Sequence, residues 1–83
     1  MKIDGPFNIS LYEGNNTIIN FQADYIMLED KKIIKVHCLE IPYQKNKSLV
    51  GKKINIVKKG EQVIYSNVPI LSVQGFVITA QGR

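Results

Sequence analysis

Residues 17–41 read TIINFQADYIMLEDKKIIKVHCLEI, two apolar stretches separated by four charged residues. The apolar side chains of the first stretch occupy alternate positions: Ile19, Phe21, Ala23, Tyr25 and Met27. A period of two is typical of a β-strand with one buried face. The stretch also lacks the 3.6-residue spacing and the capping residues of a helix. We therefore predict a strand over residues 17–28 that buries these odd-numbered positions.

The second apolar stretch, residues 33–41, repeats the alternation. Its inward positions are Ile34, Val36 and Cys38, and its outward positions are Lys35 and His37. The β-branched residues in it suit a pleated, half-buried surface. The two stretches together predict a long antiparallel hairpin. The connection Glu29-Asp30-Lys31-Lys32 lacks Asn-Gly or Asp-Gly, so we expect a four-residue loop around a type I turn.

Shorter alternating segments account for most of the remaining chain. We predict further strands over residues 7–12, 53–58, 62–65 and 70–80. Glycine, asparagine and proline predict turns between strands at residues 13–16, 59–61 and 66–69. Gly75 interrupts the last strand and is interpreted as a bulge. Leu49 and Val50 are expected to pack the polar loop after Pro42 against the end of the barrel.

These strands predict one all-β domain over residues 1–83. About six short strands, with turn signals between them and no helical segment, favour a small antiparallel barrel, SH3-like or Sm-like. A compact β-sandwich is the alternative. Ala23–Asp30 followed by Val63–Val73 resembles the pattern of Sm-like proteins. Because short barrel strands converge on such patterns, the resemblance implies a fold and no function.

Composition limits the classes of protein that the chain can belong to. No apolar run approaches the roughly 18 to 20 residues of a membrane span, and the N-terminus lacks the apolar core of a secretory signal. A single cysteine cannot form an internal disulfide. We therefore expect a cytoplasmic protein. Lysine far outnumbers arginine, and isoleucine and asparagine are abundant, a bias that indicates an AT-rich bacterium or its phage.

A search for catalytic or metal-binding patterns gives only rejections. His37 and Cys38 are neighbours on a predicted strand and project to opposite faces, so they cannot act as base and nucleophile in one site. One histidine, one cysteine and scattered carboxylates provide no ligand spacing for a metal. Gly51-Lys52-Lys53 lacks the first glycine and the Ser/Thr of a phosphate loop. We predict no enzyme, no metal and no cofactor.

One segment has a marked charge. Residues 42–60 contain six lysines and no acid, a local charge of +6 in a chain whose net charge is +4, so the remainder carries −2. The predicted ligand-binding residues are Lys45, Lys47, Lys52, Lys53, Lys58 and Lys59, with Tyr43 as a stacking partner for a base. A solvated lysine loop that only maintains solubility explains the same residues. Contact with the phosphates of a nucleic acid or nucleotide, or with an acidic protein surface, are the functional interpretations.

Apolar residues on both faces of the predicted last strand indicate self-association. Ile70, Phe76 and Ile78 fall on one face, and Leu71, Val73 and Val77 on the other, while Ile18, Ile26 and Leu39 lie on the polar face of the hairpin. We predict a small non-enzymatic binding protein, a homo-oligomer, that engages an anionic partner through the lysine segment. A phage-encoded factor that binds or sequesters a host molecule fits this description. The alternatives are a structural or assembly protein, such as a virion or scaffold component, and a protein-protein interaction module.

Overall fold

The computed structural model describes residues 1–30, 32–41, 49–60 and 62–82, which form an antiparallel sheet. Its strands are β1 (Lys2–Glu13), β2 (Asn16–Leu28), β3 (Ile33–Cys38), β4 (Lys53–Lys58), β5 (Gln62–Gln74) and β6 (Val77–Gln81). The sheet closes on itself in the order β1-β2-β3-β6-β5-β4. The predicted small antiparallel barrel is therefore confirmed. No helix capable of crossing a membrane occurs among the described residues.

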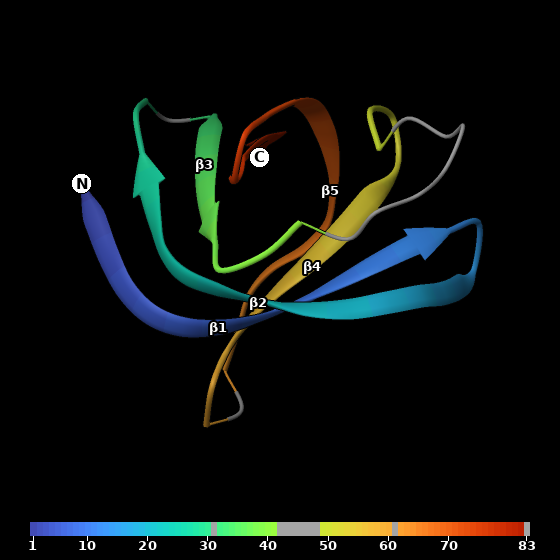
Figure 1. Cartoon of the computed structure of the whole chain (residues 1–83), viewed down its shortest axis with the longest axis horizontal. Helices are drawn as coiled ribbons and strands as arrows, with labels where there is room; N and C mark the ends of the chain where they lie inside the picture. The colour runs from blue at the N-terminus through green and yellow to red at the C-terminus, as the bar shows by residue number, and fades with distance from the viewer. Residues whose placement is uncertain (31, 42–48, 61, 83) are drawn as a thin grey trace.

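The barrel consists of two three-stranded meanders, β1-β2-β3 and β4-β5-β6. Pairing of β1 with β4 and of β3 with β6 joins the meanders and closes the sheet. Figure 1 shows β1 and β2 running together as a long curved pair, with β4 crossing them. Closure gives every strand two neighbours, each paired over part of its length.

The interior of the barrel is apolar, and no polar or charged residue is buried in the described part of the chain. The predicted inward positions of β1, β3 and β4 are all buried: Phe7, Ile9, Leu11, Ile34, Val36, Cys38, Ile54 and Ile56. The central hairpin is also confirmed, because β2 and β3 pair antiparallel with Ile26 opposite Val36. Its second arm ends at Cys38, three residues before the predicted end.

The prediction that β2 buries odd-numbered positions throughout is wrong. Ile19 is 39% exposed, and of the described residues in the first half only Phe21 and Ala23 are buried. In the second half Ile26 is fully buried, while Tyr25 and Met27 are only half-buried. The register of β2 on β3 shifts between Ala23 and Tyr25, and this bulge exchanges the faces. Ile26 is consequently a core residue and no part of an outer apolar surface.

A glycine allows β1 to bend with β2 at this bulge. A Cβ on Gly5 would clash with the carbonyl oxygen of Asp24, so a side chain cannot fit without moving the backbone. The register of β1 on β2 shifts at the same place, between Asp4 and Phe7. Close approach of two backbones at a barrel corner is a common reason for a glycine within a strand.

The predicted turn at Ser66–Pro69 is wrong, because β5 continues through it. Asn67 has a φ of 60°, and the pairing of β5 with β4 shifts there. Asparagine tolerates positive φ in a bulge as well as in a turn, so its presence does not distinguish the two.

The predicted strand over residues 70–80 is two strands joined by a hairpin turn. Gly75 and Phe76 form the turn, and Gln74 pairs with Val77 across it. Ile70 and Ile78 both face the core, but Phe76, predicted on the same face, projects from the turn and is 62% exposed. Residues 70–80 therefore do not form the single strand, apolar on both faces, from which we predicted self-association.

The turn predicted at residues 13–16 is confirmed, with Gly14 at a φ of 63°.

Candidate anionic-ligand site

The structure separates the predicted lysines into two groups. Lys52 and Lys53 lie where β4 begins, and Lys58 and Lys59 lie where it ends. Five residues at about 3.3 Å each place the two ends of the strand about 16 Å apart. Tyr43, Lys45 and Lys47 lie outside the described residues. Among the described lysines, Lys52 and Lys53 lie together at one end of β4. Lys58 and Lys59 lie at its other end.

A hydrogen-bonded turn fixes the position of Lys52 and Lys53. The backbone N–H of Lys52 donates to the carbonyl of Leu49 at 3.2 Å, and Gly51 between them has a φ of 90°. The turn is attached to β5 because Gly51 N–H donates to Ile70 O, and Ile70 N–H donates to Lys52 O. Leu49 is buried against the barrel, as we expected, whereas Val50 is 51% exposed. This end of the lysine segment is therefore anchored to the barrel.

Tyr12 is the aromatic residue beside these lysines. It pairs with Lys53 across β1 and β4, and its hydroxyl accepts a hydrogen bond of 3.0 Å from the side-chain amide of Asn55. The side-chain carbonyl oxygen of Asn55 accepts a hydrogen bond of 2.7 Å from the backbone N–H of Asn67. A single asparagine thereby holds both the Tyr12 ring and the bulge of β5, which gives the surface between them a defined shape.

Three hollows meet around Tyr12, Lys53 and Asn67. One of about 440 Å³ is lined by Tyr12, Gly14, Lys52 and Lys53 among others. A second, of about 240 Å³, shares Tyr12 and Gly14 with it and reaches Asn55 and Asn67. A third, of about 320 Å³, adjoins both at Lys53 and Asn67. We call this surface the Tyr12 groove, defined by Tyr12, Gly14, Lys52, Lys53, Asn55 and Asn67.

The positive charge of the Tyr12 groove is only partly neutralised by acidic side chains. Lys52 forms an ion pair of 3.7 Å with Glu13, and its side chain is only 16% exposed. Lys53 is exposed and forms no ion pair with a described acidic residue. An ion pair that water reaches contributes little free energy, so Glu13 can release Lys52 to another anion. The groove therefore offers one unpaired ammonium group and a second that is weakly held.

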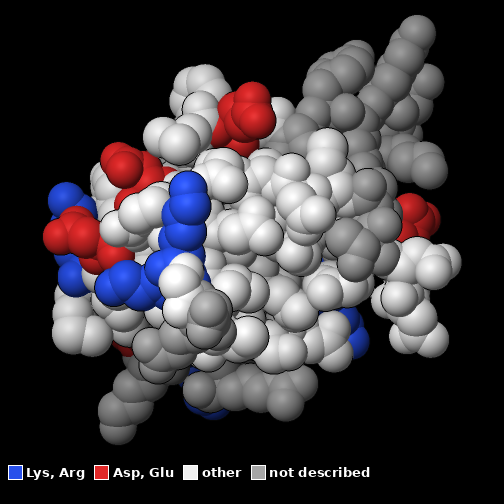
Figure 2. Space-filling view, turned by 90° about the horizontal axis from the view of Figure 1, so that it is seen from below, with Lys and Arg blue, Asp and Glu red and all other residues white. Residues whose placement is uncertain are grey.

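The charges elsewhere on the surface are mixed. Figure 2 shows lysine and acidic side chains side by side at one edge of the face seen from below, with a broad uncharged area beside them. Described ion pairs away from the groove join Lys2 to Asp4 and Lys35 to Glu29. On this face the described residues form no broad surface of one sign, so attraction of an anion depends on local lysines.

His37 and Cys38 do not form a catalytic pair. Cys38 is buried in the barrel, while the half-buried His37 ring stacks on Tyr25. Burial disfavours the charged thiolate and raises the pKa of the Cys38 thiol to about 12. No group of three metal-ligating side chains occurs among the residues that the structure describes.

Tyr12 and Asn67 were not among the ligand-binding residues predicted from the sequence. Tyr12 could have been noticed, because it is an aromatic residue on the outward parity of β1, directly before the turn at Gly14. Its position next to Lys53 could not have been predicted, because the two residues become neighbours only when the distant segments β1 and β4 pair.

Comparison with protein-family models, with curated proteins and with solved structures finds no match for this chain.

Proposed function

We propose that the protein is a non-enzymatic binding protein for a phosphate-bearing ligand, a single-stranded nucleic acid or a nucleotide, held in the Tyr12 groove. The observation that carries the proposal is that Lys52 and Lys53 both line a 440 Å³ hollow that Tyr12 also lines. This volume lies within the range of about 300 to 1,000 Å³ that is usual for small-molecule sites.

The chemistry of the lining suits phosphate better than a base edge. Lysine ammonium groups are compact point charges that contact phosphate oxygens without reading sequence. Asn15 and Asn67 side chains line the adjoining hollow and can donate hydrogen bonds to a phosphate or a sugar. We therefore expect binding that is sensitive to salt and tolerant of base sequence.

The proposed setting of this function comes from the sequence. A cytoplasmic location accords with the single, buried and protonated thiol of Cys38. The lysine, isoleucine and asparagine bias supports an origin in an AT-rich bacterium or its phage, where such a protein can bind or sequester a host molecule.

Two double variants with the same change in charge test the site. Lys52→Gln with Lys53→Gln removes the lysines of the Tyr12 groove, and Lys58→Gln with Lys59→Gln removes those at the other end of β4. Fluorescence anisotropy with a labelled single-stranded oligonucleotide should show a large loss of affinity for the first pair. Its salt dependence should fall by about one unit of slope per phosphate contact removed. The second pair should retain nearly the full salt slope.

Two results would overturn the proposal. Equal losses in the two double variants would mean that net charge, and not the Tyr12 groove, attracts the oligonucleotide. No binding by the unmodified protein at about 50 mM salt, where attraction to phosphate is strong, would exclude a nucleic acid. In that case polyglutamate is the probe for the acidic protein surface that the lysines could engage instead.

A second candidate function, assembly with copies of the same chain, is favoured by one apolar surface. The backbone N–H of Cys38 donates to the carbonyl of Phe76 at 2.8 Å, which brings Leu39 to the same end of the barrel as Phe76. Both side chains are exposed, Leu39 by 61% and Phe76 by 62%. Exposed apolar residues that lie together are typical of protein contacts. We propose that a homo-oligomer, if formed, is joined through this Leu39–Phe76 surface.

A further inference from the structure

A separate hollow lies on the outside of the barrel over β2, β3 and β6. It has a volume of about 390 Å³, and His37, Lys35, Gln74 and Val77 are among its lining residues. Tyr25, which borders it, is opposite Asp4 of β1, eight residues along that strand from Tyr12. The hollow shares no lining residue with the Tyr12 groove.

An ordered stack of side chains leads into this hollow. Tyr25 and His37 are opposite each other on β2 and β3, and their rings lie parallel within 14° at a centroid distance of 4.2 Å. The Lys2 ammonium, from β1 on the other side of β2, lies 4.5 Å from the centre of the Tyr25 ring. Asp4 holds Lys2 by an ion pair of 3.5 Å. The Lys2 ammonium thus covers the end of the stack that is nearest to β1.

The same row of the sheet continues past His37 without another ring. His37 is opposite Val77 of β6, and Val77 is opposite Gln74 of β5. Adjacent strands are about 4.8 Å apart, close to the distance between stacked rings, so the Val77 position is where a third ring would lie. Val77 is aliphatic and half-buried, and the hollow lies above it. The face of His37 directed toward β6 is therefore available for a planar group.

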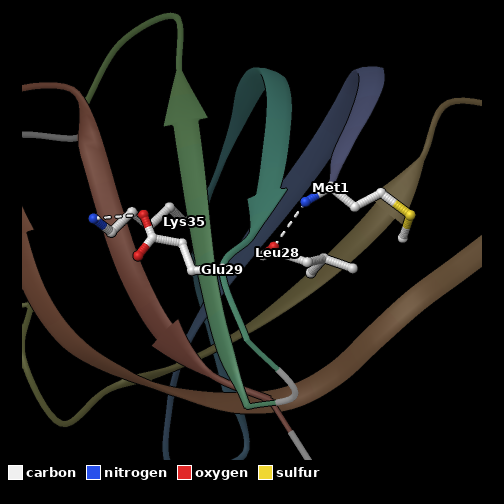
Figure 3. A network of polar contacts seen from close by, with 4 residues as sticks. All are labelled: Met1, Leu28, Glu29 and Lys35. Atoms are coloured by element: carbon white, nitrogen blue, oxygen red, sulfur yellow. Dashed lines mark hydrogen bonds and ion pairs between the residues drawn. The ribbon is translucent and has the colours of Figure 1, made fainter.

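Polar groups border the place where such a ring would lie. The Lys35 ammonium and the Glu29 carboxylate form an ion pair of 2.9 Å. Figure 3 shows this pair on one side of β3, with Met1 and Leu28 on the other. The side chains of Gln74 and Thr79 also line the hollow, and neither forms a hydrogen bond within the described part of the chain. A donor and an acceptor thus lie next to each other among the residues that line the hollow.

We propose that this hollow binds a nucleobase, stacked on His37 above Val77, with its hydrogen-bonding edge toward Glu29 and Lys35. A nucleobase combines a planar π face with adjacent donors and acceptors on its edge, as in the amino group and ring nitrogen of adenine. Stacking on a histidine ring is a common way for proteins to hold an unpaired base. The inference does not rest on the Tyr12 groove, because it requires no phosphate.

Adenosine, which has no phosphate, is the probe. His37 is the single histidine of the chain, so its ring protons give one assignable set of NMR signals. Adenosine should move these signals upfield in a saturable way, because the purine lies over the imidazole. Ribose should not move them. Purine riboside, which lacks the amino group, should bind about tenfold more weakly, the loss expected for one hydrogen bond to a charged group.

Two variants examine the geometry. Val77→Phe should block adenosine binding, because a protein ring then occupies the position above β6. Glu29→Gln leaves the core untouched and should weaken adenosine about tenfold while changing purine riboside little. Lys53→Gln, in the Tyr12 groove, is the control and should leave the adenosine affinity unchanged.

The results separate this site from the proposed phosphate site. No saturable shift of the His37 signals by adenosine, or full adenosine binding in a folded Val77→Phe variant, would overturn the nucleobase site. A loss of adenosine binding in Lys53→Gln would also overturn it, because binding would then belong to the groove. Failure of the oligonucleotide to bind the Tyr12 groove would leave the adenosine result standing.

Discussion

Two hairpin turns of this barrel have the same backbone form and different side chains. Gly14 and Asn15 connect β1 to β2, and Gly75 and Phe76 connect β5 to β6. The first residue of each turn is a glycine at positive φ, 63° in one and 59° in the other. The second residue has a negative φ in both, which is the arrangement of a type II′ turn.

The second residue of each turn determines the character of that part of the surface. Asn15 is polar and lines a hollow of the Tyr12 groove, whereas Phe76 projects an apolar ring beside Leu39. The turn geometry depends on glycine and leaves the next position free to vary. The two turns therefore present a polar side chain at one place on the surface and an apolar side chain at another.

The largest effect is expected from a change that removes the barrel supporting both turns. Val36 is fully buried, so Val36→Asp places a carboxylate without a partner in an apolar interior and should unfold the protein. Lys35→Asp, on the outer face of the same strand, loses the ion pair with Glu29 and should cost about 1 kcal/mol or less. Thermal unfolding followed by circular dichroism measures both. Similar melting temperatures for the two variants would contradict the assigned faces of β3.

A pH effect should report on the burial of the Cys38 thiol at the end of β3, next to the Phe76 turn to which the Cys38 backbone N–H donates. Burial raises the pKa of Cys38 from 9.0 to about 12, so the unfolded chain loses its thiol proton first. The Cys38 contribution to stability is fully present below pH 9.0 and is lost as the pH rises toward about 12. The loss should approach about 1.4 kcal/mol per pH unit.

The Cys38→Ala variant is the control for this pH effect, since tyrosines and lysines also titrate in the range. The difference in unfolding free energy between the natural protein and Cys38→Ala, measured by urea denaturation at several pH values, isolates the thiol. A difference that does not change with pH would show that Cys38 is open to water.

Substituting the two glycines tests whether the turns are equivalent. Gly14→Val and Gly75→Val each place a β-branched residue at positive φ, which should cost about 1 to 3 kcal/mol. A Cβ at either position would meet no atom within 4 Å, so the cost is conformational and should be similar in the two turns. Urea denaturation measures the free energy of unfolding. Asn15→Val, at negative φ, is the control and should cost less. A cost at only one glycine would contradict the shared turn geometry.

The smallest effect on stability is expected at Phe76. Phe76→Ser changes an exposed side chain and should alter the unfolding free energy by no more than about 0.5 kcal/mol. It should nevertheless abolish self-association if the Leu39–Phe76 surface joins copies of the chain. Light scattering at micromolar concentration compares the natural protein, Phe76→Ser and the control Asn15→Ser. A monomeric natural protein, or a Phe76→Ser variant that still associates, would exclude this contact.

The amino-acid sequence by itself determined the all-β class and the faces of the regular strands. In β3, and over residues 7–11 of β1 and 54–56 of β4, every second residue is apolar and buried, because side chains of an extended chain alternate between the two faces. The Gly14-Asn15 turn could also be predicted from the sequence, since Gly-Asn between two alternating segments is a common hairpin signal. Gly75-Phe76 lacks such a second residue, and a glycine within an apolar segment is equally typical of a bulge.

The tertiary structure decided where the alternation is interrupted and which distant residues meet. The bulges of β2 and β5 arise where strands bend to close the barrel, so Ile26 replaces Tyr25 in the core although the local alternation favours Tyr25. Tyr12 meets Lys53 through β1–β4 pairing, and His37 faces Val77 through β3–β6 pairing. Such contacts depend on the register of strands far apart in the chain. Alternation along a single strand carries no information about that register, which closure of the barrel sets.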